Sequence, residues 1–165
     1  MKKNLFIGLV FAMLALLVEQ VSDVLLATEV SRWDLMTMGP LVFEKSSGLH
    51  SLLSFVYKDT ASIVYLIIFA GICALVFALA ILFTAKRKTV LAVGLFIVFG
   101  GLGANLVDII VNETHEIIAY LYYPLQSGAL LWINVAQIIM VVGVLVAFVG
   151  LFIRAKKDKK ELANA

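Results

Sequence analysis

Cysteine, proline, histidine and charge are all scarce in this sequence. Its 165 residues include one cysteine, two prolines and two histidines, and charged residues make up only 15% of the chain. The lone Cys73 cannot form a disulfide within the chain, and two isolated histidines are a poor basis for a metal site. We therefore expect no metal and no cofactor. Hydrophobic residues, by contrast, make up 63% of the chain, which is typical of an integral membrane protein.

Four apolar stretches are long enough to cross a membrane. They cover approximately residues 5–26, 62–83, 89–107 and 130–153, each close to the ~20 residues that span the hydrocarbon core of a bilayer. Each is expected to be helical, because lipid offers no hydrogen-bonding partner to an open backbone. The sequence predicts a single all-α membrane domain of four transmembrane helices that covers residues 1–165.

Positive charge gathers at three places that this topology puts on one side of the membrane. Lys2 and Lys3 precede the first stretch, residues 86–88 form a basic turn between the second and third, and five basic residues follow the fourth. The positive-inside rule then predicts that both termini are cytoplasmic. We interpret the basic C-terminal tail as part of this topology signal rather than as an arm that binds lipid or nucleic acid, and no nucleic-acid partner is expected.

The connection between the first and second stretches, about residues 28–60, is too long for a simple turn. The loosely alternating segment Leu41–Glu44 lies between two turn-forming sequences, Gly39-Pro40 and Ser46-Ser47-Gly48. A short strand or hairpin on the outer membrane surface is expected here, forming a small extracytoplasmic β-cradle. The aromatic residues of this loop fit an interfacial belt and a substrate cradle equally well.

The third and fourth stretches each carry an asparagine followed three residues later by another polar side chain. These are Asn105 and Asp108 on the third stretch, and Asn134 and Gln137 on the fourth. Residues three apart share one face of a helix, so each pair is expected to point the same way. Polar side chains inside a membrane are costly and usually mark a functional site. The alternative is structural: amide side chains join helices, and the glycines among residues 94–103 only allow close packing.

These residues resemble the motifs of the lipoprotein signal peptidases (signal peptidase II), a family of four-span intramembrane aspartic peptidases. In that family the third helix ends with G-N-x-x-D-R and the fourth begins with F-N-x-A-D, and the two aspartates form the catalytic dyad. Here residues 104–109 match the first motif at Asn105 and Asp108, with Ala104 and Ile109 as departures. Residues 133–137 match the second at Asn134 and Ala136, and Gln137 replaces the aspartate.

Two weaker matches extend the resemblance along the chain. Residues 19–23, Glu-Gln-Val-Ser-Asp, stand where the family has an Asp-Gln-x-Ser-Lys-like segment, and Ser46-Ser47-Gly48 stands where it has Asn-x-Gly. The resemblance implies the bacterial inner membrane as location, with membrane lipid and a transmembrane segment or lipoprotein as partners. It also implies that Asp108 is the remnant of a catalytic dyad. The candidate contacts to a substrate or partner are Asn105, Asn134, Gly48, Ser46 and Glu19.

The replacement of an aspartate by Gln137 bears directly on catalysis. In an aspartic dyad two neighbouring carboxylates share a proton, so that one accepts a proton from water while the other donates to the peptide carbonyl. Glutamine has no ionisable group, and the loss of an acid–base partner typically costs about 10²–10⁴ in rate. Glu19, at the end of the first stretch, is the best candidate for a substitute carboxylate.

Three functions remain as hypotheses. The first is a pseudoprotease that binds a transmembrane or lipidated protein without cleaving it. The second is a working peptidase of altered mechanism that uses Asp108 and Glu19. The third is a structural subunit of a membrane complex, in which the polar residues and the glycine faces of residues 94–104 and 143–150 only hold helices together. A channel or transporter is disfavoured, because no stretch carries a chain of charged residues.

Overall fold

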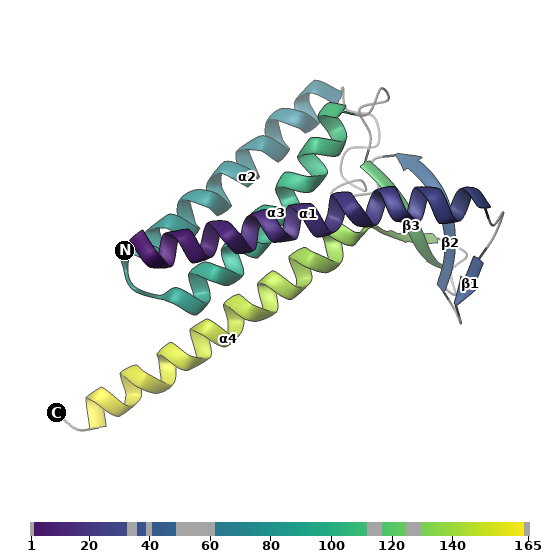
Figure 1. The fold of residues 1–165 in the computed structure, drawn as a ribbon. Helices are drawn as coiled ribbons and strands as arrows, with labels where there is room; N and C mark the ends of the chain where they lie inside the picture. The colour runs from purple at the N-terminus through teal and green to yellow at the C-terminus, as the bar shows by residue number, and fades with distance from the viewer. Residues whose placement is uncertain are drawn as a thin grey trace.

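A computed structural model describes residues 2–32, 36–38, 41–48, 62–111, 117–124 and 130–163. Within these residues the chain forms four long helices, α1 (Lys2–Arg32), α2 (Ser62–Ala85), α3 (Thr89–Val111) and α4 (Val135–Ala163) (Figure 1). Each helix contains a segment long and apolar enough to cross a membrane. The prediction of a four-helix membrane protein is therefore confirmed.

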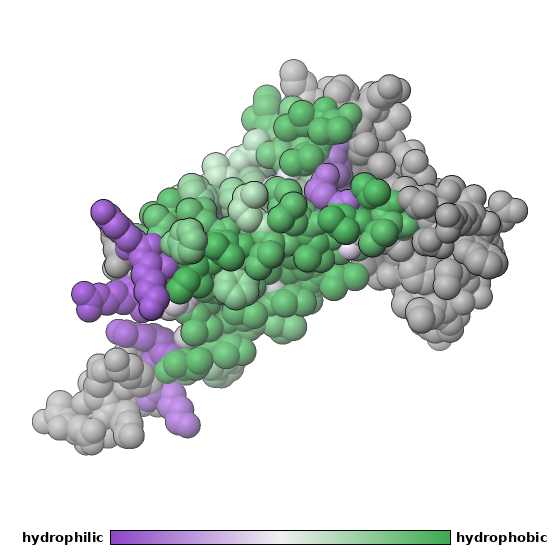
Figure 2. Space-filling model, in the orientation of Figure 1, coloured by the Kyte–Doolittle hydropathy of each residue, from purple (hydrophilic) through white to green (hydrophobic). Residues whose placement is uncertain are grey.

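The outer surface of the bundle is apolar along most of its length (Figure 2). Large hydrophobic side chains such as Phe6, Leu14, Leu145 and Phe152 are exposed on α1 and α4. A surface of this kind would be a liability in water, but it matches the acyl chains of a bilayer. Hydrophilic side chains gather at the end of the bundle where the chain begins, which we call the basic end.

A four-stranded antiparallel sheet lies at the opposite end of the bundle, which we call the sheet end (Figure 1). Its strands follow one another in the order β1 (Met36–Met38), β2 (Leu41–Gly48), β3 (Ile117–Pro124) and β4 (Leu130–Ile133). Strand β2 pairs with β3, so the sheet joins the segment after α1 to the segment before α4. The sheet contacts α1 and α3. The expected hairpin between the first two helices is confirmed by β1 and β2.

One prediction about this end of the molecule was wrong, and two of its strands were not predicted. Strands β3 and β4 were not expected, and the fourth span was expected to begin near residue 130, whereas Leu130–Ile133 is strand β4 and α4 begins at Val135. Hydropathy does not distinguish a short apolar strand from the first turn of an apolar helix. As a result Gln137 lies in the first turn of α4. The helices α1 and α3 also extend beyond the predicted ends at 26 and 107, to Arg32 and Val111.

Helix α3 occupies the centre of the bundle and packs against each of the other three helices. Its contact with α4 is made by glycines at which the two backbones meet. A Cβ atom added to Gly94 would lie 2.7 Å from the carbonyl oxygen of Gly143, and one added to Gly101 would lie 2.9 Å from that of Ala136. The spacing of seven residues from Gly94 to Gly101, and from Ala136 through Gly143 to Gly150, is that of a left-handed helix pair.

The contact of α3 with α1 is equally close. A Cβ atom added to Gly100 would lie 2.7 Å from the Cβ atom of Ala15, and the Phe96 ring, which is fully buried, packs directly against Gly8. On the opposite side, Phe77 of α2 makes an edge-on contact with Phe96, with 6.1 Å between ring centroids. Small residues therefore set the distance between α1 and α3, and aromatic rings fill the space between α3 and α2.

The glycine contact between α3 and α4 predicts the effect of one added methyl group. Gly94→Ala should destabilise the protein by about 1–3 kcal/mol, because the methyl group would meet the backbone of α4. Gly71→Ala on α2 is the matched control, because a Cβ atom there meets nothing within 4 Å. Thermal unfolding in detergent micelles measures both. Equal melting temperatures for the two variants would contradict the packing described here.

Candidate functional site

Polar side chains from three helices meet next to the sheet. Four of them are almost completely enclosed: Glu19 and Asn105 are fully buried, and Asn134 and Asp108 are 2% and 7% exposed. They come from α1, from the last two turns of α3 and from the start of α4. Buried polar groups at membrane depth are expensive, so their concentration at one place indicates a functional role.

The packing of α1 determines where Glu19 points. Ala12, Ala15 and Glu19 are all buried, and their spacing of three and four residues puts them on one stripe of α1. The alanines of this stripe lie against Gly100 of α3. Gly100 lets the backbones of α1 and α3 approach closely. Glu19, on the same stripe as the alanines, therefore also faces α3. Asp108 lies two turns further along α3 than Gly100.

A glutamine connects the two acidic side chains. The Nε2 atom of Gln20 donates one hydrogen bond to Oε2 of Glu19 over 2.9 Å and another to Oδ1 of Asp108 over 3.1 Å. An amide NH₂ group has two hydrogens, so both bonds can form at the same time. Gln20 thereby holds the two carboxyl groups in a fixed relation to each other.

Asp23 completes a cluster of three acids. It follows Glu19 by one helical turn, and carboxylate oxygens of Glu19, Asp23 and Asp108 all lie within 4.8 Å of one another. One oxygen of each side chain, Oε1 of Glu19 and Oδ of the two aspartates, is buried without a hydrogen-bond partner in the described part of the chain. Three negative charges at this spacing repel strongly, so the cluster favours shared protons or a positively charged ligand.

The cluster offers the atoms that a hard cation prefers but not a complete set. Calcium takes about six to eight oxygen ligands and magnesium takes about six. Glu19, Asp23 and Asp108 each offer one carboxylate oxygen at metal-binding distance from the others. The remaining ligands of a cation can be water molecules, and neighbouring carboxylates can instead share protons. The set therefore fits both acid–base chemistry and the binding of a hard cation.

A second polar pair joins α3 to α4. The side-chain Nδ2 of Asn134 donates a hydrogen bond to Oδ1 of Asn105, and both residues are buried. The Oδ1 atom of Asn134 accepts a hydrogen bond of 2.8 Å from the backbone N–H of Gln137. Asn134 is thus the N-cap of α4, because its side chain satisfies an N–H group of the first turn. One side chain therefore both starts α4 and attaches it to α3.

The structure brings most of the predicted site residues together. The buried cluster contains Glu19, Asn105, Asp108 and Asn134. The backbone N–H of Gln137, in the first turn of α4, donates a hydrogen bond to the side chain of Asn134. The two other predicted residues are elsewhere in the fold, in strand β2: Ser46 pairs with Ala119 and Gly48 with Ile117. A binding role for these two stays a prediction.

Sequence reasoning missed two members of the site, Gln20 and Asp23. Both lie in the segment of residues 19–23 that carries part of the resemblance. The spacing from Glu19 to Asp23 is four residues, which places two acids on one helix face in a membrane span. That spacing was a usable signal. The bridging role of Gln20 was not readable, because it depends on how closely α1 and α3 approach.

An apolar groove runs along the bundle beside the polar cluster. It has a volume of about 290 Å³ and is bordered by α1, α3 and α4. Val18 of α1 and Ile138 of α4 line it. Val18 is followed in sequence by Glu19, and Ile138 is preceded by Gln137. The other residues that line it are Phe11, Leu14, Ala15, Ile97, Ile139 and Val142. The groove therefore lies in the membrane-spanning part, and its lining is entirely apolar.

Comparison with known proteins supports the fold. No family model and no curated protein matches this chain. Two solved structures, each of a bacterial membrane enzyme determined by the in meso method, at 2.3 Å and 1.9 Å resolution, have a similar fold. The first has a TM-score of 0.66 and 15% identity over 91% of this chain and 90% of that chain. The second has a TM-score of 0.65 and 16% identity over 87% of this chain and 91% of that chain.

The double role of Asn134 can be separated by two substitutions. Asn134→Ala removes the cap and the interhelical bond and leaves Asn105 without its partner, so we expect a loss of about 1–3 kcal/mol in the free energy of unfolding. Asn134→Ser keeps a capping oxygen and loses only the interhelical bond, whose average value in membranes is about 0.6 kcal/mol. Thermal unfolding in micelles compares the two. Equal losses would argue against a capping role.

Proposed function

We propose that this protein is a signal-peptidase-II-like membrane protein that binds a transmembrane or lipidated segment of another protein without cleaving it. The apolar groove between α1, α3 and α4 is the observation that carries this proposal. It lies within the membrane-spanning helices, and Val18 and Ile138 of its lining are next in sequence to Glu19 and Gln137. An occupant that fits both parts is apolar along most of its length and has an exposed peptide backbone at the sheet end.

The polar cluster supports recognition of a peptide backbone. A backbone leaving a helix inside a membrane has unpaired N–H and C=O groups that need partners. Oε1 of Glu19 and Oδ2 of Asp108 can accept from N–H groups, and Nδ2 of Asn105 can donate to a carbonyl. All three atoms are buried and have no partner within the described residues. A bound peptide would satisfy them.

The absence of cleavage is proposed from the chemistry of Gln137. Residues 133–137 resemble the family motif that ends in a catalytic aspartate, and here that position holds an amide that neither accepts nor releases a proton in the working pH range. Asp108 in turn is committed through Oδ1 to a hydrogen bond from Gln20. These two features favour binding over turnover.

A second candidate function is aspartic-type hydrolysis by Glu19 and Asp108. The observation in its favour is that their carboxylate oxygens lie within 4.8 Å of each other, with one unpartnered oxygen on each. Such a pair can share a proton and act as acid and base on one water molecule. The solved structures with a similar fold are of bacterial membrane enzymes, which is consistent with this candidate.

The third hypothesis, a structural subunit, stays a prediction. It gives the polar residues and the glycine faces only the role of holding helices together. Gly94, Gly101, Gly143 and Gly150 pack within this chain, at the contact of α3 with α4, and Gly100 packs on α1. This packing agrees with that role, so it does not distinguish the structural hypothesis from the two candidate functions above.

Site-specific photocrosslinking tests the binding proposal. A photoreactive residue at Leu14, in the groove, should crosslink to an added lipid-modified prolipoprotein in micelles. The same residue at Leu75 of α2, which is 60% exposed and outside the groove, is the control and should not. Equal crosslinking at both positions, or none at Leu14, would count against the groove as a binding site.

Cleavage assays separate the two candidate functions. With the same prolipoprotein we expect no product from the wild type, whereas Gln137→Asp should gain cleavage if the groove holds the substrate. If the wild type does cleave, and Glu19→Gln and Asp108→Asn each lower the rate at least ~10²-fold, the second candidate is correct. A gel shift measures the product, and an active signal peptidase II confirms that the substrate is competent.

A further inference from the structure

Three acidic side chains from two helices lie close together at the sheet end of the bundle. Glu19 and Asp23 belong to α1 and Asp108 belongs to α3, and one carboxylate oxygen of each lies within 4.8 Å of the other two. Negative charges at this spacing repel each other, and the repulsion is strong where little water is present to screen it. The cluster therefore needs positive charge or protons to offset this repulsion.

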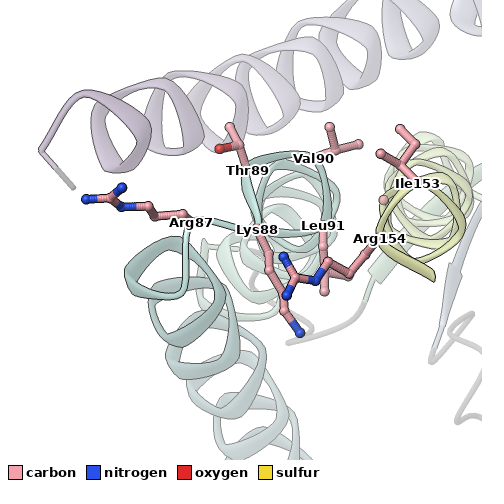
Figure 3. A pocket seen from close by; sticks show the side chains of 8 residues that line it. Arg87, Lys88, Thr89, Val90, Leu91, Ile153 and Arg154 are labelled. Carbon is pink, nitrogen blue, oxygen red and sulfur yellow. The ribbon is translucent and has the colours of Figure 1, made fainter. Parts of the chain in front are cut away.

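Basic residues are absent from the segments that supply the acids. No lysine or arginine occurs in residues 4–31 or in residues 89–153. The basic side chains that the structure describes lie at the basic end of the bundle, and Figure 3 shows Arg87, Lys88 and Arg154 there, around the start of α3. Asp108 lies in the last turn of α3, about 28 Å from that start at ~1.5 Å per residue. These basic side chains are therefore too far away to pair with the acids.

The side chain that bonds to two of the acids is uncharged. Nε2 of Gln20 donates hydrogen bonds to Glu19 and to Asp108, which positions both carboxyl groups and leaves their charge uncompensated. Oε1 of Glu19, Oδ1 of Asp23 and Oδ2 of Asp108 are buried and have no hydrogen-bond partner among the described residues. Glu19 as a whole is fully buried, and Asp108 is 7% exposed. Oxygens that are enclosed in this way without a partner indicate a ligand that the chain itself does not supply.

The positions of the oxygens fit one hard divalent cation. Calcium binds oxygen at about 2.3–2.6 Å, so two of its ligands can be at most roughly 5 Å apart. The three carboxylate oxygens, which lie within 4.8 Å of one another, can therefore reach a single ion. Scarce cysteine and histidine argue against metals that prefer sulfur or nitrogen, but calcium and magnesium take oxygen ligands. Calcium is the better fit for side chains on two packed helices, because its geometry is more flexible than that of magnesium.

The cluster is enclosed at Glu19 and more open at Asp23. Glu19 is fully buried, whereas Gln20 and Asp23 are partly exposed. Asp23 lies one turn nearer the sheet end, and hydrophilic atoms reach the surface beside α1 in this region (Figure 2). A cation can thus enter past Asp23 and keep water molecules as its remaining ligands.

We propose that Glu19, Asp23 and Asp108 form a binding site for a hard divalent cation, with calcium as the best fit. The ion joins α1 to α3, since two ligands come from one helix and one from the other. These helices are in close contact at Gly100, which holds the ligands near each other before the ion arrives. The site does not rest on the function proposed for the groove. A carboxylate has about four acceptor positions, so it can bind the ion and also accept from a peptide N–H.

Calcium titration of the purified full chain tests this proposal. Isothermal titration calorimetry and thermal unfolding are recorded in micelles after EDTA treatment and dialysis. We expect one Ca²⁺ per chain, and a rise of about 5 °C in the melting temperature when Ca²⁺ is ~100-fold above its Kd. Asp23→Asn should weaken Ca²⁺ binding at least ~10-fold, because it removes a charged ligand. Without Ca²⁺ this variant should melt no lower than the wild type, because one repulsive charge is gone.

The matched control is Glu161→Gln, which removes one acid near the end of α4 and should bind Ca²⁺ as the wild type does. Binding of neither Ca²⁺ nor Mg²⁺ would overturn the proposal and assign shared protons to the cluster. Equal affinity in Asp23→Asn and the wild type, or equal stabilisation by KCl of matched ionic strength, would also overturn it. Tighter binding of Mg²⁺ than of Ca²⁺, lost in Asp23→Asn, would support the site and change its ion.

The titration is independent of the peptide-binding proposal. It contains no peptide, and Asp23 is not among the groups proposed to contact one, so crosslinking at Leu14 can succeed or fail separately. The melting temperature without Ca²⁺ shows that each variant is folded. Asp108→Asn serves in place of Asp23→Asn if the latter does not fold, with the same expected loss of Ca²⁺ affinity.

Discussion

The close contact of α3 with both α1 and α4 is the constraint on which the rest of the structure depends. Lipid provides no hydrophobic drive for helices to associate, so association rests on close packing and polar contacts. Gly100 lets α1 pack against α3, and Gly94 and Gly101 let α4 do the same. At each of these glycines the neighbouring helix is too close for a methyl group to fit. Because α3 lies between two neighbours at backbone contact, its C-terminal turns present Asn105 towards α4 and Asp108 towards α1.

The polar residues at the end of α3 divide into two groups with different chemistry. The asparagine pair is satisfied mainly by itself and by the first turn of α4, so it fixes helix geometry. The three acids keep an oxygen each without a partner, in surroundings where water is scarce. Buried groups that are left unsatisfied are costly, and natural proteins retain them where a ligand or a reaction uses them. The acids of α1 and α3, together with the unpartnered Nδ2 of Asn105, are therefore the groups that we propose contact a ligand.

The sequence was sufficient to predict where the helices lie along the chain, but not which side chains meet between them. Long apolar runs located α2 and α3 to within a few residues, because membrane thickness fixes their length. Residues 130–133 were misassigned because strand β4 is as apolar as the helix that follows, although Asn134 was a readable capping signal. Spacing placed Asn105 and Asp108 one turn apart on α3, but their expected common direction was wrong, because Asn105 bonds to Asn134 and Asp108 bonds to Gln20 of α1. The link from Gln20 to Asp108 joins residues 88 apart in sequence and could not be found from spacing.

The pairing of β2 with β3 sets an order for the assembly of the protein during synthesis. Strand β2 is made soon after α1, but its partner follows α3, so it must wait until three helices have entered the membrane. Pairing between segments so distant in sequence is slow to form. The acid cluster has a similar requirement, since Glu19 lies on α1 and Asp108 lies in the last turn of α3. A nascent chain therefore has no assembled acid cluster until α3 has been inserted.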